Sequence, residues 1–155
     1  MVNTKYETPK SRESTLRSCW DVICYNSGQN QNLFVLNIHP PTEEKEDDVK
    51  DALYEEMDRV IDKIPKRDII IIIMGDANAK VGREEIYKEI VGKHSKHEES
   101  NNNGLRLIEL AIERNMKIVS TQFQRKDIHK GTWIIPGRQE TNQIDHVLIQ
   151  EKPSG

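Results

Sequence analysis

The feature that most constrains the fold is a continuous apolar run, with five isoleucines at positions 69–73 followed by Met74. β-Branched side chains favour strands, and a strand with one solvated face would alternate apolar and polar residues. The run therefore predicts a central strand that is buried on both faces.

The apolar run ends at Gly75, and Asp76 and Asn78 follow at alternate positions. If the backbone stays extended, both side chains point to the same side at the carboxyl end of the strand, where ligand sites of layered α/β folds usually lie. Alternatively, Gly-Asp-Ala-Asn is a simple turn, because these residues favour turns. Composition favours neither interpretation.

The overall composition indicates one globular domain. The chain has 155 residues, of which 35% are hydrophobic and 32% charged, and its net charge is −3. This charge gives no global case for nucleic-acid binding, so any such contact requires a local basic surface. Cys19 and Cys24 would be too far apart on an extended strand for a disulfide, which predicts reduced thiols in an intracellular protein. The sequence has no run of membrane-spanning length, and its first 17 residues lack the apolar core of a signal peptide.

The chain divides into a polar arm at 1–18, a folded domain at 19–150 and a tail at 151–155. The domain begins with two β-rich segments, Trp20–Tyr25 and Asn32–Ile38, which predict a hairpin.

A helix is predicted after this hairpin, with Thr42 as its N-cap and Pro65 as its end. The strand–helix–strand order predicts a crossover between parallel strands. Apolar residues at helical spacing predict the buried face of this helix, namely Val49, Leu53, Met57, Val60, Ile61 and Ile64.

The second half predicts one more helix and three strands. The helix, Gly104–Arg114, follows an asparagine run that can cap it, and the strands are Met116–Thr121, Thr132–Ile135 and Gln143–Gln150. The predicted apolar face of the helix consists of Leu105, Ile108 or Leu110, and Ile112. His94 and His97 lie in a polar loop without a cysteine, which favours solvated histidines over a metal site.

Five segments in the same order resemble the endonuclease/exonuclease/phosphatase superfamily, in particular the apurinic-endonuclease-like domain of RTE-type non-LTR retrotransposons. Residues 75–82 resemble its Gly-Asp-Phe-Asn-Ala motif, with Ala77 in place of the aromatic residue. The other matching segments are His39-Pro-Pro-Thr42, Asn103-Gly-Leu-Arg-Leu107, Thr132-Trp133 and Asn142-Gln-Ile-Asp145. The resemblance covers about residues 32–150 and implies a four-layered α/β sandwich of two packed sheets flanked by helices, incomplete here relative to the family.

The resemblance also implies Mg²⁺-dependent cleavage of DNA phosphodiester bonds and a nuclear location. Asp76 would orient or deprotonate the attacking water and would be a weak metal ligand. Asn78 would hold a phosphate oxygen or the water, His39 would contact the scissile phosphate, and Asp145 would orient a histidine. Alternatively, His39 fills a turn and Asp145 bonds to the backbone at a strand end.

Four residues are candidates for DNA contact, namely Arg125, Lys126, Lys130 and Trp133. The alternatives are a solvated loop for the cations and a core position for the tryptophan.

Two parts of the family's site have no counterpart in this sequence, namely the metal-binding glutamate and the C-terminal Ser-Asp-His segment. His146 does not replace the histidine, because it should point away from the face that carries Asp145. We therefore expect weak or no nuclease activity from a domain truncated at both ends. A catalytically dead binding module is the alternative, and uncovered sheet edges or faces would favour a protein partner or aggregation.

Overall fold

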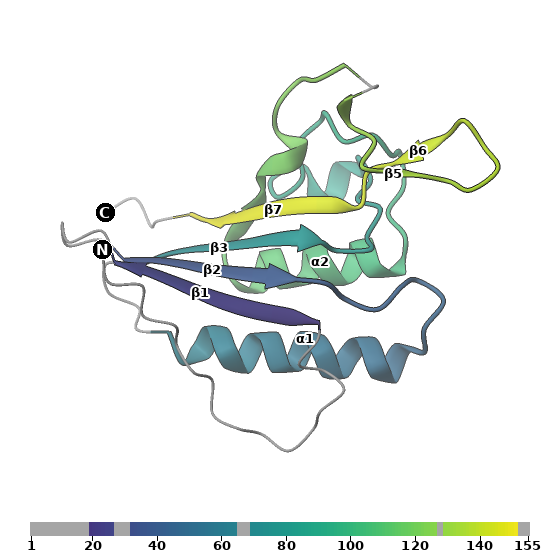
Figure 1. The fold of residues 1–155 in the computed structure, drawn as a ribbon. Helices are drawn as coiled ribbons and strands as arrows, with labels where there is room; N and C mark the ends of the chain where they lie inside the picture. The colour runs from purple at the N-terminus through teal and green to yellow at the C-terminus, as the bar shows by residue number, and fades with distance from the viewer. Residues whose placement is uncertain (1–18, 27–31, 65–68, 127–128, 152–155) are drawn as a thin grey trace.

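The computed structural model describes residues 19–26, 32–64, 69–126 and 129–151. For residues 23–26 it describes the backbone alone. The described residues form a five-stranded sheet in the order β1-β2-β3-β7-β4 and a two-stranded sheet, β5-β6 (Figure 1). The predicted arm at 1–18 lies outside these residues, as does all of the predicted tail except Glu151.

The strands are β1 (Trp20–Asn26), β2 (Asn32–Ile38), β3 (Ile69–Asp76), β4 (Met116–Ile118), β5 (Trp133–Ile134), β6 (Thr141–Asn142) and β7 (Asp145–Gln150). The helices are α1 (Asp47–Asp62) and α2 (Asn102–Glu113), with 3₁₀ turns η1 (Glu85–Tyr87) and η2 (Val119–Thr121). The predicted α/β class with two sheets is confirmed. The second sheet is small, because each of its two described strands has only two residues. Neither described helix has the length and apolarity needed to cross a membrane.

The order of the main sheet follows from its connections. β1 and β2 form the predicted antiparallel hairpin, and α1 crosses over to β3, which lies parallel to β2. β7 then pairs antiparallel with β3 on one side and with β4 on the other. β3 is therefore a central strand, as predicted.

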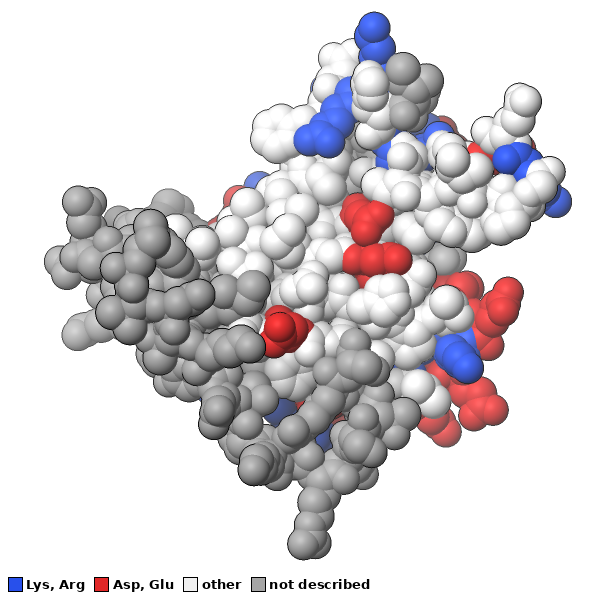
Figure 2. Space-filling view, in the orientation of Figure 1, with Lys and Arg blue, Asp and Glu red and all other residues white. Residues whose placement is uncertain are grey.

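Burial along β3 alternates, so the prediction that both faces are buried is wrong. Ile71 and Ile73 are buried in a core shared with Leu53 of α1 and Leu107 of α2, whereas Met74 is 41% exposed. Both helices pack on the same face of the sheet, and Figure 1 shows α2 behind it. Figure 2 looks onto the opposite face, which we call the open face, where uncharged side chains surround a few acidic ones.

Tertiary contacts also change the predicted face of α1. The prediction of Thr42 as the N-cap is wrong, because the helix begins after Glu46. The Thr42 carbonyl instead accepts a hydrogen bond from the Lys45 N–H in the turn before the helix. Val49 is 41% exposed, and Lys50 is buried in its place. The Lys50 ammonium can be buried because it donates hydrogen bonds to the Glu43 carbonyl (2.6 Å) and to Asn102 Oδ1 (3.3 Å).

The later elements differ from the prediction in three places. In α2, Leu105 and Ile112 are exposed, while Ile108 and Leu110 are buried beside Leu107 and Ala111. The predicted strand Met116–Thr121 turns into η2 after Ile118. The predicted strand Thr132–Ile135 is shortened to β5, which pairs with β6.

Candidate functional site

Two carboxylates lie side by side at one end of the open face. Asp76 of β3 and Asp145 of β7 are direct cross-strand partners. Because side chains alternate along a strand, Asp76 shares a face with Met74, and Asp145 shares a face with Val147. The carboxyl end of the central strand therefore carries an acidic pair.

A histidine approaches this pair from the neighbouring strand. β2 and β3 run parallel, so residues after Ile38 lie beside the end of β3, and His39 Nδ1 is 3.8 Å from Asp76 Oδ2. Gly75 makes this approach possible. Its φ is +130°, and a Cβ there would lie 2.3 Å from the Ile38 carbonyl oxygen. The structure thus brings together three predicted site residues.

Asn78 has a different position from the one that an extended backbone would give it. The strand ends at Asp76, and Asn78 has a left-handed φ of 47°. Its backbone N–H donates to Asp76 Oδ1 (3.0 Å), and its side-chain amide donates to the Pro40 carbonyl (2.7 Å). The extended interpretation is therefore wrong, and the turn interpretation describes this segment better.

A second asparagine, whose role the sequence did not reveal, completes this turn. The buried amide of Asn103 donates to the carbonyl oxygens of Asn78 (2.9 Å) and Pro41 (3.0 Å). Asn78 and Asn103 together hold the loop between β2 and α1 against the end of β3. This loop carries His39, so both asparagines position the histidine beside Asp76.

His146 lies behind the acidic pair, on the helical side of the sheet, as predicted. Its Nε2 is 2.9 Å from the Ala79 carbonyl, so Nε2 carries the proton, and Nδ1 (3.0 Å) accepts the hydrogen bond of the Ser120 hydroxyl. Burial lowers the pKa of His146 to about 4. A neutral, fully hydrogen-bonded imidazole on this side cannot act as a base beside Asp76.

The two predicted loop histidines, His94 and His97, are both half-buried. The Nε2 of His97 accepts a hydrogen bond from the Gln143 N–H (3.2 Å). Burial, with smaller effects from Lys80 and Lys96, lowers the pKa of His97. The prediction of a freely solvated side chain is therefore wrong for His97.

The acidic pair does not by itself make a complete magnesium site. Mg²⁺ takes oxygen ligands in octahedral geometry, and one oxygen of Asp76 already accepts the Asn78 N–H. Within the described ranges, no three His, Cys, Asp or Glu side chains gather in a way that could hold a metal ion. The described residues thus do not fit Mg²⁺ without a further ligand.

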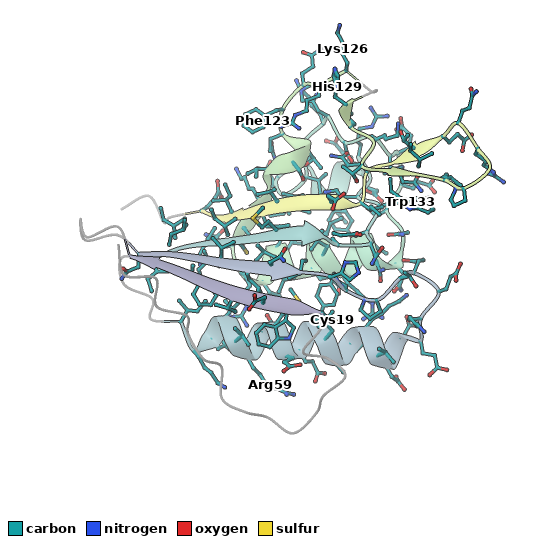
Figure 3. The ribbon with its side chains drawn as sticks, in the orientation of Figure 1. Cys19, Arg59, Phe123, Lys126, His129 and Trp133 are labelled. Atoms are coloured by element: carbon teal, nitrogen blue, oxygen red, sulfur yellow. The ribbon has the colours of Figure 1, made fainter. Side chains whose placement is uncertain are left out.

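The candidate DNA-contacting residues lie on two surface segments. Arg125 and Lys126 are exposed, Lys130 is half-buried, and Trp133 on β5 is 44% exposed, so the core interpretation of the tryptophan is wrong. Figure 3 shows Lys126 and His129 at the tip of one loop and Trp133 on the β5–β6 hairpin.

The segment that carries Trp133 is tied to the acidic pair. Thr132 Oγ1 accepts hydrogen bonds from the N–H groups of Ile144 (3.0 Å) and Asp145 (3.2 Å), which places Trp133 one residue from a direct contact of Asp145. No described hydrogen bond or ion pair joins Arg125 or Lys126 to this group. The structure therefore unites His39, Asp76, Asp145 and the start of β5, with Asn78 in a supporting position.

Comparison with known proteins gives two kinds of similarity. The chain is 33% identical over 125 residues to craniofacial development protein 2 of Bos taurus and 32% identical to that of Tragulus javanicus, alignments that cover 81% of this chain. It spans 21% of the length of each relative. A solved endonuclease/exonuclease/phosphatase family protein from Leptotrichia buccalis aligns with a TM-score of 0.49 and 14% identity, over 85% of this chain and 42% of that one. No protein-family profile matches the sequence.

Proposed function

From the order of its motifs, which resembles the endonuclease/exonuclease/phosphatase superfamily, we infer that this chain is a segment of a domain of that type and acts on DNA. One observation carries the inference: Asp76 and Asp145 are cross-strand partners on the open face, and His39 lies 3.8 Å from Asp76. Paired carboxylates and an imidazole at strand ends suit the activation of water and the binding of a phosphate.

The roles follow from these positions. Asp76 orients or deprotonates the attacking water, and His39 contacts the phosphate. Asp145 adds negative charge beside Asp76 and orients a histidine that approaches the Asp145 carboxylate. Asn78 acts mainly as a positioning residue, because its amide holds the loop that carries His39.

Cleavage of DNA by this chain alone is expected to be weak or absent. Phosphodiesterases of this family draw on Mg²⁺ to neutralise the phosphate, and the described residues supply two carboxylates rather than a full ligand set. A further carboxylate from outside these residues would complete the centre. This shortage also supports the alternative function, a DNA-binding or protein-binding module without catalysis.

Nicking of supercoiled plasmid tests the catalytic part. The chain, Asp76→Asn and the control Glu140→Gln, which changes an exposed carboxylate on the β5–β6 hairpin, are compared with Mg²⁺ and with EDTA. We expect little nicking by any of them. Robust Mg²⁺-dependent nicking that only Asp76→Asn abolishes would support the endonuclease and show that a complete centre is present after all.

Binding of a fluorescent DNA duplex tests the nucleic-acid part. We propose that the surface in contact with DNA is formed by Arg125, Lys126, Lys130 and Trp133. We also propose that the protein is located in the nucleus. Arg125→Ala/Lys126→Ala should weaken binding and lower its salt slope by about 2, at about one unit per phosphate contact. Lys45→Ala/Lys93→Ala, which removes two exposed cations elsewhere, should leave binding unchanged. Folded protein that neither binds nor nicks DNA would contradict the assignment.

A further inference from the structure

The part of the chain between Ser120 and Thr132 starts and ends beside Asp145. At its start, the Ser120 hydroxyl donates to Nδ1 of His146, the neighbour of Asp145 (3.0 Å). At its end, the Thr132 hydroxyl oxygen accepts a hydrogen bond from the Asp145 N–H (3.2 Å). A ligand bound by the intervening residues, 121–131, is therefore held near the acidic pair.

Two aromatic side chains at this part of the molecule are exposed. Phe123, which follows η2, is 64% exposed, and Trp133, which follows Thr132, is 44% exposed. Figure 3 shows the Phe123 side chain projecting outward, well apart from Trp133. One exposed ring is ordinary on a protein surface, but two rings that flank a segment fixed beside the acidic pair suggest a ligand with flat aromatic groups.

The charge of this segment is opposite to that of the whole chain. Residues 121–131 include three cations, Arg125, Lys126 and Lys130, and one carboxylate, Asp127, whereas the net charge of the chain is −3. Arg125 and Lys126 are exposed, and neither forms an ion pair with a described residue. Exposed rings and free cations together match the two parts of a nucleotide, because bases stack on aromatic side chains and phosphates attract cations.

We propose that this segment binds unpaired nucleotides of a DNA strand. Phe123 and Trp133 stack on two different bases of the strand, since their rings lie apart, and Arg125 and Lys126 contact its phosphates. In an intact duplex the neighbouring base pairs cover the faces of each base, so an exposed ring stacks only on a base that has left the duplex. The inference rests on the proposed function and narrows its substrate class to DNA with a single-stranded part.

Binding of a short oligothymidylate, which does not pair with itself, tests the proposal on the whole chain. Its bases should quench the fluorescence of Trp133 by stacking on the indole ring. The chain has one other tryptophan, Trp20, which is half-buried, and Trp133→Leu should therefore abolish the quenching. The oligothymidylate should bind more tightly than a duplex of the same length.

Variants of exposed residues separate stacking from general apolar contact. Phe123→Leu keeps an apolar side chain but removes the ring, and it should weaken oligothymidylate binding at least about fivefold, as expected for the loss of one base–aromatic stack. Its binding of the duplex should change less than about twofold. The control Ile134→Ala removes apolar surface at a position that is 67% exposed, and it should bind oligothymidylate within about twofold of the original chain.

Inorganic polyphosphate, which carries negative charge without bases, should leave the fluorescence of Trp133 unchanged. Quenching by polyphosphate, unchanged oligothymidylate binding in Phe123→Leu, or equal weakening in Ile134→Ala would overturn the stacking role. Tighter binding of the duplex would overturn the substrate class. In each of these cases, duplex binding that depends on Arg125 and Lys126 would leave the proposed function standing, whereas folded protein that binds neither DNA would contradict both.

Discussion

Asp76 and Asn78 are two residues apart but perform different tasks. The Asp76 carboxylate lies on the open face beside His39, whereas the Asn78 side chain turns away to hold the Pro40 carbonyl. The left-handed φ of Asn78 causes this separation, because it ends the alternation of the strand.

Substitutions of Asn78 separate its hydrogen bond from its backbone conformation. Asn78→Gly loses the bond to Pro40 but tolerates a positive φ, and we expect a loss of about 1 kcal/mol in the free energy of unfolding. Asn78→Ala also forces a β-carbon into the left-handed region and should lose about 2 kcal/mol. Urea denaturation measures both. Equal losses would show that the backbone conformation is not strained for alanine.

His146 makes stability depend on pH. Its folded pKa of about 4 lies below the ordinary value of 6.5, so between these values the unfolded chain binds the proton more readily. Stability is therefore full above pH 6.5 and falls as the pH is lowered toward 4, by about 3 kcal/mol from this group. His97 contributes in the same direction.

Urea denaturation across this pH window isolates the His146 contribution. His146→Gln should lower stability at neutral pH and should flatten its decline between pH 6.5 and 4. The control His129→Gln changes an exposed histidine and should keep the original slope. If His146→Gln leaves the dependence of the free energy of unfolding on pH unchanged, the acid sensitivity comes from other groups.

At the scale of elements, the start of α2 is stabilised by a residue from another part of the chain. Both oxygens of the Glu43 carboxylate accept hydrogen bonds from N–H groups of the first turn, those of Asn102 and Asn103 (3.0 Å each). A negative charge there also interacts favourably with the helix dipole.

Replacement of Glu43 tests this cross-chain cap. Glu43→Ala should lower the free energy of unfolding by about 1–2 kcal/mol, as loss of a charged cap does. Hydrogen exchange of the Asn102 and Asn103 amides should accelerate. Glu44→Ala removes the neighbouring exposed carboxylate and is the matched control. If both variants have the same effect, the change reflects net charge and not the cap.

Sequence patterns predicted elements well and their environments less well. The hairpin of β1 and β2, the crossover through α1 and the central place of β3 follow from local periodicity and connection rules. Lys50 is buried where Val49 was expected to be, because the Lys50 ammonium donates hydrogen bonds to the Glu43 carbonyl and to Asn102. These two acceptors are far apart in the sequence, so no local pattern predicts them. The two-residue strand β6 has no periodicity to detect.

The same limit applies to the candidate site. Motif order predicted Asp76, Asp145 and His39, and the structure brings them together. The positioning role of Asn103 depends on contacts with Pro41 and Asn78 from two other segments, and no local pattern contains this information.

For the whole molecule, the open face is the least protected feature. Val35, Ile72 and Ile149 are partners across β2, β3 and β7, and all three are only half-buried. Met74, beside this row, is 41% exposed. An apolar stripe that crosses three strands favours association with another sheet surface, because burial of apolar area is favourable.

We therefore expect this chain in isolation to associate with itself through the open face. Its mass in sedimentation experiments should rise with concentration, and Met74→Lys should weaken the association at least about tenfold, because it places an unpaired charge in the apolar stripe. Ile86→Lys is the matched control, because Ile86 is 81% exposed on η1 and outside the sheet. It should associate like the original chain. A monomer at every concentration would show that the open face is adequately covered within the chain, and equal effects of both lysines would place the contact elsewhere.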